Sequence, residues 1–303
     1  MKEIEKLYLR HNIISSVELL KGWSKDKKYI LTSSNSEKFI LRLTSSDYFM
    51  ERKRQFNILK KVSKLNINTT KAVDFGYLED GTVYMLLTYL PGEEGLDYIK
   101  KVSDEEAYKL GIQAGKILKK LHQIKIKRPE ISWKDRYDVK AEIKINNILN
   151  CKYKIKYLDK LIKYYKDNIH LMENRPIKFS HGDFHLGNMI INDNKIGIID
   201  FEKSTIADPY DDLKPFRWNV FGNAYFETGL INAYFSNNIP KNFFEILKFY
   251  SVEAMISQLP WALNYGQEEI DMAYYMIEKQ MEWLEVLDLI VPTWYKGIIK
   301  KFE

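Results

Sequence analysis

The sequence predicts an α+β protein with two lobes, a small β-rich N-terminal lobe and a larger, mainly helical C-terminal lobe. Short alternating segments separated by turn residues are concentrated before Pro91-Gly92. Helical spacing of hydrophobic residues dominates the chain after that point. One hairpin pattern interrupts these helices, and it carries the residues with the clearest chemical meaning.

The first lobe is predicted over residues 1–91 and the second over 92–303, because Pro91-Gly92 ends the last strand pattern. Within the first lobe, Phe56, Leu59 and Val62 fall on one face of a predicted helix. The expected strands are 28–32, 38–43, 72–78 and 83–90, and the expected helix is 49–64.

The second lobe begins with a strong helix signal. Ser103-Asp104-Glu105-Glu106 has the pattern of a capping box. Hydrophobic residues then recur at helical spacing as far as Leu121. Further helices are expected at 155–165, 212–235, 241–263 and 267–290.

Composition narrows the class of protein. Cys151 is the only cysteine among 303 residues, so there is no intrachain disulfide framework and a reducing cytoplasm is expected. The N-terminus has no apolar signal-like stretch, and no apolar run is long enough to span a bilayer, so no membrane partner is expected. The net charge of +6 permits an anionic partner. Because the lysine-rich segment 152–166 has no accompanying nucleic-acid motif, it is interpreted as a solvated helix face.

The hairpin predicts a metal site. Two β-branched runs flank the turn residues 192–195, and a hairpin centred near Asn194 puts Asn188 opposite Asp200 within about a residue of register. Amide and carboxylate oxygens suit Mg²⁺, which leaves its remaining positions for phosphate and water. Asp183 precedes Asn188 by five residues and can face the same site without binding the metal. The set can hold Mg²⁺-ATP and activate a hydroxyl, which predicts a phosphotransferase.

Two segments of the first lobe are candidates for phosphate contacts. In the strand at 38–43, Ile40 and Arg42 share the face opposite Phe39 and Leu41, so Arg42 can neutralise phosphates while Ile40 covers a purine ring. Ser24 lies in a turn that could cover phosphates with its hydroxyl and backbone N–H groups. That turn lacks the known glycine-rich phosphate-binding patterns.

The histidines of the hairpin region have a structural interpretation. His181 and His185 flank Asp183 with the spacing H-x-D-x-H, which could also suggest a metal. Because further His or Cys ligands are missing nearby, zinc is disfavoured and both are expected to support the loop. Asp208 is expected to cap a helix or to bond to the Asp183 loop.

Taken together, these motifs resemble the aminoglycoside phosphotransferase family, small-molecule kinases related to the protein kinases. The resemblance covers almost the whole chain, because the order of the lobes also agrees. The residues that carry it are His181-Gly182-Asp183, Asn188, Ile199-Asp200-Phe201 and Asp208-Pro209-Tyr210-Asp211-Asp212-Leu213.

The resemblance implies a bilobal protein-kinase-like fold with a nucleotide-binding first lobe. It implies that Asp183 accepts the proton of the acceptor hydroxyl, and that Asn188 and Asp200 hold Mg²⁺. ATP, with GTP as the alternative, would bind backbone groups of Thr88 and Leu90. In this family a lysine usually stands at the position of Arg42, and the carboxylate that pairs with it aligns with Gln55, with Glu51 as the nearest alternative.

The acceptor is expected to be a small cationic molecule such as an aminoglycoside, because residues 253–288 carry eight acidic residues and only one basic residue. Trp261, Tyr265 and Trp283 could instead form an apolar wall, although core packing is the preferred interpretation. The alternatives are a kinase for choline, homoserine, a macrolide or another metabolite, and a nucleotide-binding pseudokinase. The sequence does not indicate an oligomeric state.

Overall fold

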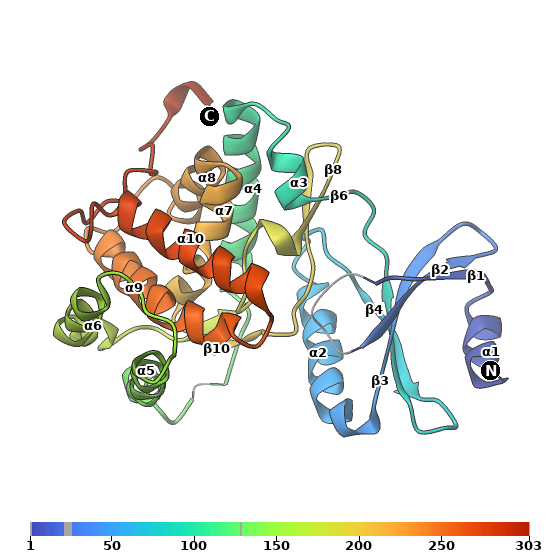
Figure 1. Ribbon diagram of the computed structural model, residues 1–303. Helices are drawn as coiled ribbons and strands as arrows, with labels where there is room; N and C mark the ends of the chain where they lie inside the picture. The colour runs from blue at the N-terminus through green and yellow to red at the C-terminus, as the bar shows by residue number, and fades with distance from the viewer. Residues whose placement is uncertain (1, 21–25, 128, 303) are drawn as a thin grey trace. The chain divides into compact units, whose positions relative to one another are not determined.

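The computed structural model describes residues 2–20, 26–127 and 129–302, and the chain packs as two units (Figure 1). Unit 1 comprises Met1–Glu94 and Asn188–Lys203, and unit 2 comprises Gly95–Gly187 and Ser204–Glu303. Unit 1 is the small β-rich lobe and unit 2 the larger, mainly helical lobe that the sequence predicts. The hairpin after Asn188, which the sequence places in the second lobe, packs with the first unit.

Unit 1 contains an antiparallel five-stranded sheet in the order β1-β2-β3-β5-β4. Leu41 of β3 is fully buried on one face, where Leu7 of α1 packs against the same core. The other face of β3 carries Arg42, and α2 supplies Arg52 to the same charge cluster. The elements are α1 (Lys2–Arg10), β1 (Ile13–Glu18), β2 (Lys27–Ser33), β3 (Lys38–Thr44), the 3-10 helix Ser46–Tyr48, α2 (Phe49–Val62), β4 (Ala72–Tyr77) and β5 (Val83–Thr88).

The predicted functional hairpin is present as β8 (Met189–Asn192) and β9 (Lys195–Ile198), with β6 (Glu93–Glu94) beside β8. Asp193 and Asn194 both have positive φ, 47° and 57°, as a two-residue type I′ turn requires. Thr69 anchors the hairpin in unit 1, because its Oγ1 donates to Ile198 O at 2.8 Å.

Unit 2 is built around the close packing of α4 against α8. A Cβ on Gly111 would lie 2.0 Å from Phe226 O, and one on Gly229 would lie 2.3 Å from Tyr108 O. The two helices can approach this closely because glycine has no Cβ. Ser103 caps α4 by accepting from Glu106 N, as its sequence predicts. The elements are α3 (Gly95–Ile99), α4 (Asp104–Leu121), α5 (Trp133–Leu149), α6 (Leu158–Asp167), β7 (Lys178–Ser180) paired with β10 (Thr205–Ala207), α7 (Phe216–Gly222), α8 (Ala224–Tyr234), α9 (Phe243–Ala262), α10 (Gln267–Trp283) and the 3-10 helices Ile169–Met172, Leu186–Asn188, Pro209–Leu213 and Lys300–Phe302.

Two helical predictions for unit 2 need correction. The continuous helix expected at 212–235 is divided into a 3-10 helix, α7 and α8. Pro215 lacks the N–H that would continue the 3-10 helix. The Asn223 side chain caps the start of α8 by accepting from Tyr225 N. Helix α5 was not expected, although Trp133, Tyr137 and Ala141 are buried at four-residue spacing.

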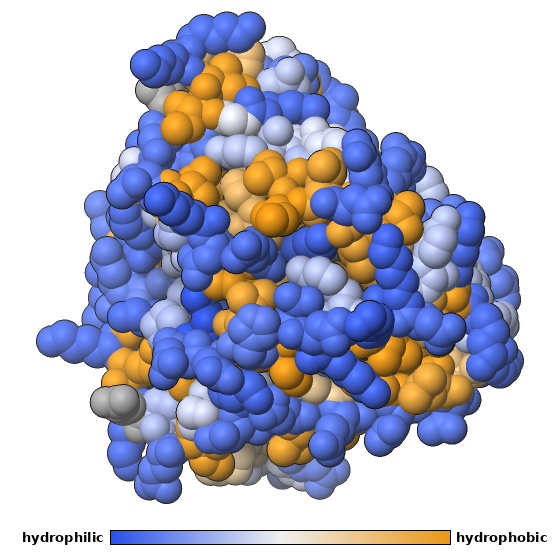
Figure 2. Space-filling view, turned by 90° about the vertical axis from the view of Figure 1, so that its left-hand side faces the viewer, coloured by the Kyte–Doolittle hydropathy of each residue, from blue (hydrophilic) through white to orange (hydrophobic). Residues whose placement is uncertain are grey.

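Figure 2 shows the side of the molecule on which α5 and α6 lie in Figure 1, where hydrophobic groups are interspersed with hydrophilic ones. Among the described helices, none is both long and apolar enough to cross a bilayer. Cys151 is a buried free thiol. Trp261 and Tyr265 are exposed with ring centroids 4.5 Å apart, so the expectation that they pack in a core is wrong for these two residues.

Candidate active site

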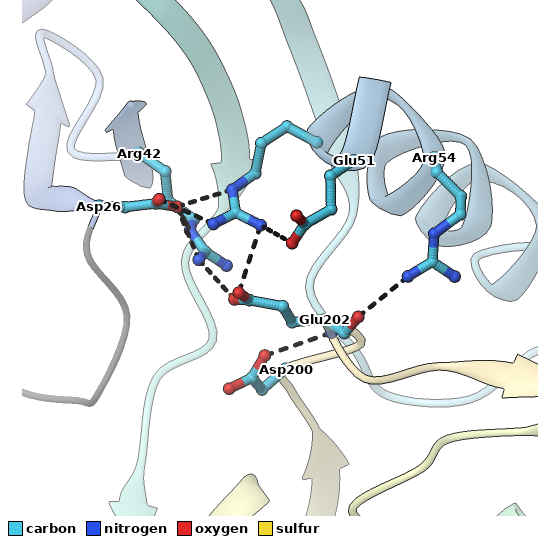
Figure 3. Close-up of polar contacts among 7 residues, drawn as sticks. Asp26, Arg42, Glu51, Arg54, Asp200 and Glu202 are labelled. Atoms are coloured by element: carbon cyan, nitrogen blue, oxygen red, sulfur yellow. Dashed lines mark hydrogen bonds and ion pairs between the residues drawn. The ribbon is translucent and has the colours of Figure 1, made fainter. Parts of the chain in front are cut away.

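In unit 1, β3 holds Arg42 in a buried ionic contact with two carboxylates. Arg42 Nε donates to Asp26 Oδ2 at 2.7 Å, and its Nη2 donates to Glu202 Oε2 at 2.8 Å. Asp26 immediately precedes β2, whereas Glu202 follows Asp200-Phe201. Segments far apart in the sequence therefore fix the orientation of this guanidinium (Figure 3).

Helix α2 contributes an arginine to this cluster in place of the expected carboxylate. Arg52 binds Asp26 through two nitrogens, with Nε–Oδ2 at 3.0 Å and Nη2–Oδ1 at 2.8 Å. Glu51, one of the two predicted partners of Arg42, instead accepts from Arg52 Nη1 at 2.9 Å. The other, Gln55, is buried, and its Oε1 makes no hydrogen bond. The carboxylate partners of Arg42 are thus Asp26 and Glu202, neither of which lies on the helix.

The two arginines, Arg42 and Arg52, favour the ionised form of the carboxylates beside them. Burial alone would raise the pKa of Asp26, but hydrogen bonds and charge from Arg52 and Arg42 outweigh it and lower the pKa. The pKa of Glu202 is likewise lowered, because hydrogen bonding and charge from Arg42 and Arg52 exceed the effect of burial. Lys28 lies opposite Arg42 on β2, and burial followed by the Arg42 charge lowers its pKa.

The other predicted nucleotide contacts also lie in unit 1. Ile40 is part-buried on β3, opposite Leu87 of β5. At the end of β5, Thr88 N donates to Lys71 O and Tyr89 N to Lys38 O, so those two N–H groups are engaged within the unit. Thr88 O and Leu90 N remain the predicted contacts for the adenine edge. Ser24 lies outside the described residues.

The hairpin brings the predicted metal residues close along its backbone. Ile199 N donates to Asn188 O at 3.0 Å, which places Asn188 one residue out of register with Asp200. Asp200 has φ of 61°, unusual for a residue other than glycine, and its Oδ1 accepts from Glu202 N at 3.3 Å. Asn188 precedes β8 and Asp200 follows β9. Amide and carboxylate oxygens suit Mg²⁺, a hard cation that needs one or two protein oxygens. In the described part of the chain, no group of three or more His, Cys, Asp or Glu side chains could hold a metal ion.

In unit 2, Asp212 holds the loop that carries Asp183. This fully buried carboxylate accepts from His181 N at 2.8 Å, Gly182 N at 2.6 Å and His122 Nε2 at 3.1 Å. Its pKa is lowered because the hydrogen bond and charge of His122 outweigh burial. Asp208 does not bind the loop; it caps the 3-10 helix and receives two bonds from Arg175.

The histidines serve the loop differently. Asp183 N donates to Nδ1 of the buried His181 at 3.3 Å. His185 Nε2 lies 3.5 Å from Asp183 Oδ1, so His185 contacts the predicted base directly. Its Nδ1 accepts from Gly187 N at 3.0 Å.

A second anchor joins the loop to α8. Leu186 N donates to Asn219 Oδ1 at 2.8 Å, and Asn219 Nδ2 donates to Glu227 Oε2 at 2.7 Å. Burial raises the pKa of Glu227 to about 8, against the opposing effect of the Asn219 hydrogen bond. Burial therefore favours the protonated form of Glu227 at the end of this chain of bonds.

Positive charge also lies close to Asp183. Burial lowers the pKa of Arg217 to about 10, and the negative charge of Asp183 acts in the opposite direction. The Nε of Arg217 is buried and makes no hydrogen bond. From the predicted acidic segment, Glu253 is buried beside Lys214 at 3.2 Å, with Lys144 in closer contact.

Several of these residues were not singled out from the sequence. Asp26 and Glu202 have no predicted role. Their pairing joins Arg42 to positions 16 and 160 residues away, and no local pattern contains that information. Asp212 belongs to the segment 208–213, which carries part of the family resemblance. That segment was the available signal for Asp212.

The two-lobed fold and this set of residues define a small-molecule kinase with a protein-kinase-like architecture. The model of the phosphotransferase enzyme family (APH) matches residues 16–235, more than half of the chain. The chain therefore belongs to the phosphotransferase enzyme family. A sequence comparison with curated proteins finds no match.

Similar solved structures support the fold. The GDP complex of wild-type aminoglycoside 2'-phosphotransferase-IIIa is 15% identical, with a TM-score of 0.73 over 93% of this chain and 97% of that one. The streptomycin-ATP-APH(2")-IIa ternary complex is 17% identical, with a TM-score of 0.65 over 92% and 95%. The macrolide 2'-phosphotransferase MphH from Brachybacterium faecium is 15% identical, with a TM-score of 0.63 over 91% and 97%.

Proposed function

We propose that this protein transfers the γ-phosphoryl group of ATP, or of GTP, to a hydroxyl group of a small molecule in a reducing cytoplasm. The observation that carries the proposal is the loop around Asp183, which the buried Asp212 carboxylate holds by two backbone N–H groups. Such fixation keeps a proton acceptor in one orientation, as phosphoryl transfer to a hydroxyl requires.

Each residue has a separate role in the proposal. Asp183 orients the acceptor hydroxyl and accepts its proton, while Asn188 and Asp200 hold Mg²⁺. When bound, Mg²⁺ neutralises charge on the phosphates. Arg42 binds the phosphates, and backbone groups of Thr88 and Leu90 bind the adenine. Ile40 covers the base, and Ser24 belongs to the proposed phosphate-covering turn.

Substitution of the proposed base tests the function. We expect Asp183→Ala to reduce phosphoryl transfer by about a hundredfold or more, because general base catalysis contributes on that order. Nucleotide affinity, measured by calorimetry, should change little. Asp159→Ala is the matched control, since Asp159 is an exposed carboxylate on α6. Equal turnover by the Asp183 variant and the wild type would refute the assignment.

The first candidate acceptor is a cationic molecule such as an aminoglycoside. Solved structures with this fold include complexes with streptomycin, gentamicin and kanamycin. In this chain, the first turn of α10 carries the exposed Glu268 and the part-buried Glu269, which could attract ammonium groups. Glu253 is a poor candidate for that task, because lysines already surround it.

The second candidate is an acceptor that carries a carboxylate or phosphate group. Arg217 favours it, because the guanidinium interacts with the Asp183 charge and retains a buried Nε without a hydrogen bond. An ammonium group beside the reacting hydroxyl would be repelled by this cation, whereas an anionic group would be attracted.

One panel distinguishes these candidates. Purified protein would be given radiolabelled ATP or GTP with aminoglycosides, macrolides, choline, homoserine and anionic hydroxy compounds, and products would be identified by mass spectrometry. Phosphorylation of aminoglycosides supports the first candidate, and phosphorylation of anionic compounds supports the second. Nucleotide binding without transfer to any acceptor favours a pseudokinase.

A further inference from the structure

We propose that Asp26 is the positioning residue of Arg42, and that it couples helix α2 to the nucleotide phosphates through a carboxylate shared by two arginines. This inference rests on the proposed nucleotide-binding role of Arg42. It assigns the coupling to a residue outside the helix, and it gives the helix an arginine where a carboxylate was expected.

The contacts of Asp26 carry the inference. Its Oδ2 accepts from Nε of Arg42 at 2.7 Å and from Nε of Arg52 at 3.0 Å, while Oδ1 accepts from Arg52 Nη2 at 2.8 Å. Arg42 Nη2 also lies 2.7 Å from Asp26 Oδ2. Because Asp26 contacts two nitrogens of Arg42, it fixes the plane of the guanidinium as well as its charge.

Burial distinguishes Asp26 from the other carboxylates of the cluster. The side chain of Asp26 is 0% exposed, compared with 28% for Glu202 and 46% for Glu51. Contacts in water are screened and individually weak, whereas a buried carboxylate between two cations is strongly coupled to both. Without Asp26, the two guanidinium groups would share the part-exposed Glu202, and Arg42 would lose its buried carboxylate partner.

The position of Arg52 explains how α2 enters the arrangement. Arg52 is buried on α2 and donates two hydrogen bonds to Asp26. A displacement of the helix would pull on Asp26 and thereby on Arg42. The sequence predicts a carboxylate on the helix that binds Arg42 directly. In the structure the helix instead supplies a cation, Arg52, which acts on Arg42 through the Asp26 carboxylate.

The test compares two substitutions that make the same change in charge. Asp26→Asn and Glu51→Gln each remove one negative charge close to the arginines. If Asp26 were only a nearby charge, its removal would strengthen the binding of anionic nucleotide. We expect the opposite: Asp26→Asn should raise the nucleotide Kd by about tenfold, whereas Glu51→Gln should stay within about twofold.

Two measurements separate positioning from general damage to the fold. Calorimetry should give the Kd of ATP with and without Mg²⁺, and kinetics should show a raised KM for ATP with kcat within about threefold. In an Arg42→Met background, Asp26→Asn should have no further effect on Kd, because Asp26 acts through Arg42. Additive losses in this cycle would overturn the proposal.

A conservative variant covers the case in which Asp26→Asn does not fold. Asp26→Glu keeps the charge but displaces it by one methylene, so we expect a several-fold rise in Kd. If every folded Asp26 variant binds nucleotide with wild-type affinity, this inference is overturned while the proposed function is not. If the wild-type protein itself binds neither ATP nor GTP, the proposed function fails together with it.

Discussion

At the residue scale, the Arg42 guanidinium contacts two carboxylates through two of its nitrogens, and this makes arginine and lysine inequivalent at this position. Nε donates to Asp26, and Nη2 donates to Glu202 while also lying 2.7 Å from Asp26 Oδ2. A lysine carries a single compact charge on a flexible stem and cannot reproduce both bonds with that geometry.

We therefore expect Arg42→Lys to raise the nucleotide Kd by about tenfold, although lysine is the usual residue at this position in the resembled family. Arg54→Lys is the control, because Arg54 donates to the backbone carbonyl of Glu202 at an exposed site. Calorimetric titration with ATP checks both. Unchanged affinity of the Arg42 variant would mean that charge alone suffices.

The sequence predicted the positions of the chemical residues better than their partners. The place of Arg42 on a strand follows from alternation, and hairpin arithmetic places Asn188 and Asp200 opposite each other to within the one residue of register that is observed. The contacts of Arg42 could not be predicted in this way, since Asp26 and Glu202 lie outside regular elements. Partners brought together by tertiary packing leave no periodic signal in the chain.

At the element scale, the contact between α4 and α8 depends on residues without side chains. Gly111→Ala should lower the free energy of unfolding by about 2 kcal/mol, because overpacking against Phe226 O exceeds the gain in helix propensity. Lys116→Ala, an exposed change on the same helix, should stay within about 0.5 kcal/mol. Urea denaturation measures both, and equal stability of the two variants would contradict the expected clash.

Glu227 of α8 makes stability depend on pH. Its pKa of about 8 in the folded protein exceeds the ordinary value of 4.5, so folding favours the protonated form. The contribution is fully present below pH 4.5 and is lost as the pH rises to about 8, by at most about 5 kcal/mol.

Glu227→Gln cannot ionise, and it should abolish this loss while its amide oxygen still accepts from Asn219. We expect the variant to gain stability relative to the wild type as the pH rises from 5 to 8, with the gain levelling off above about pH 8. Urea unfolding at several pH values tests this. A difference between the proteins that does not vary with pH would show that Glu227 is already charged when folded.

Elements with strong local signals were predicted correctly, and those divided by tertiary contacts were not. The hairpin and the capped helix α4 follow from turn residues and from Ser103. The division of 212–235 depends on Pro215 and on Asn223, whose capping bond overrides a continuous apolar pattern. Periodicity alone could not show where one helix ends and the next begins.

At the scale of the whole molecule, bound nucleotide should stabilise the fold through its metal. We expect ATP with Mg²⁺ at one hundred times its Kd to add about 2.7 kcal/mol to the free energy of unfolding. Removal of Mg²⁺ with EDTA should reduce the accompanying rise in melting temperature, and Asp200→Ala should make the melting temperature insensitive to EDTA. Identical shifts with and without Mg²⁺ in the wild type would argue against a metal at Asn188 and Asp200.

The order of the two lobes could be predicted from composition and periodicity, but the acceptor could not. The sequence predicted that acidic residues of the C-terminal helices bind the acceptor. In the structure Glu253 forms ion pairs with lysines, whereas other acidic residues of this segment are exposed. Arg217 belongs to none of the sequence motifs, although its guanidinium interacts with the charge of Asp183. Recognition of the acceptor depends on such tertiary neighbours.

The single buried cysteine makes the protein suitable for site-directed labelling. Because Cys151 is only 5% exposed, a cysteine introduced on the surface would be the faster to react with a thiol-directed dye. Lys64 in unit 1 and Lys166 in unit 2 are exposed positions for such a pair. Energy transfer between dyes at these sites would then follow the separation of the two units in solution as nucleotide and acceptor are added.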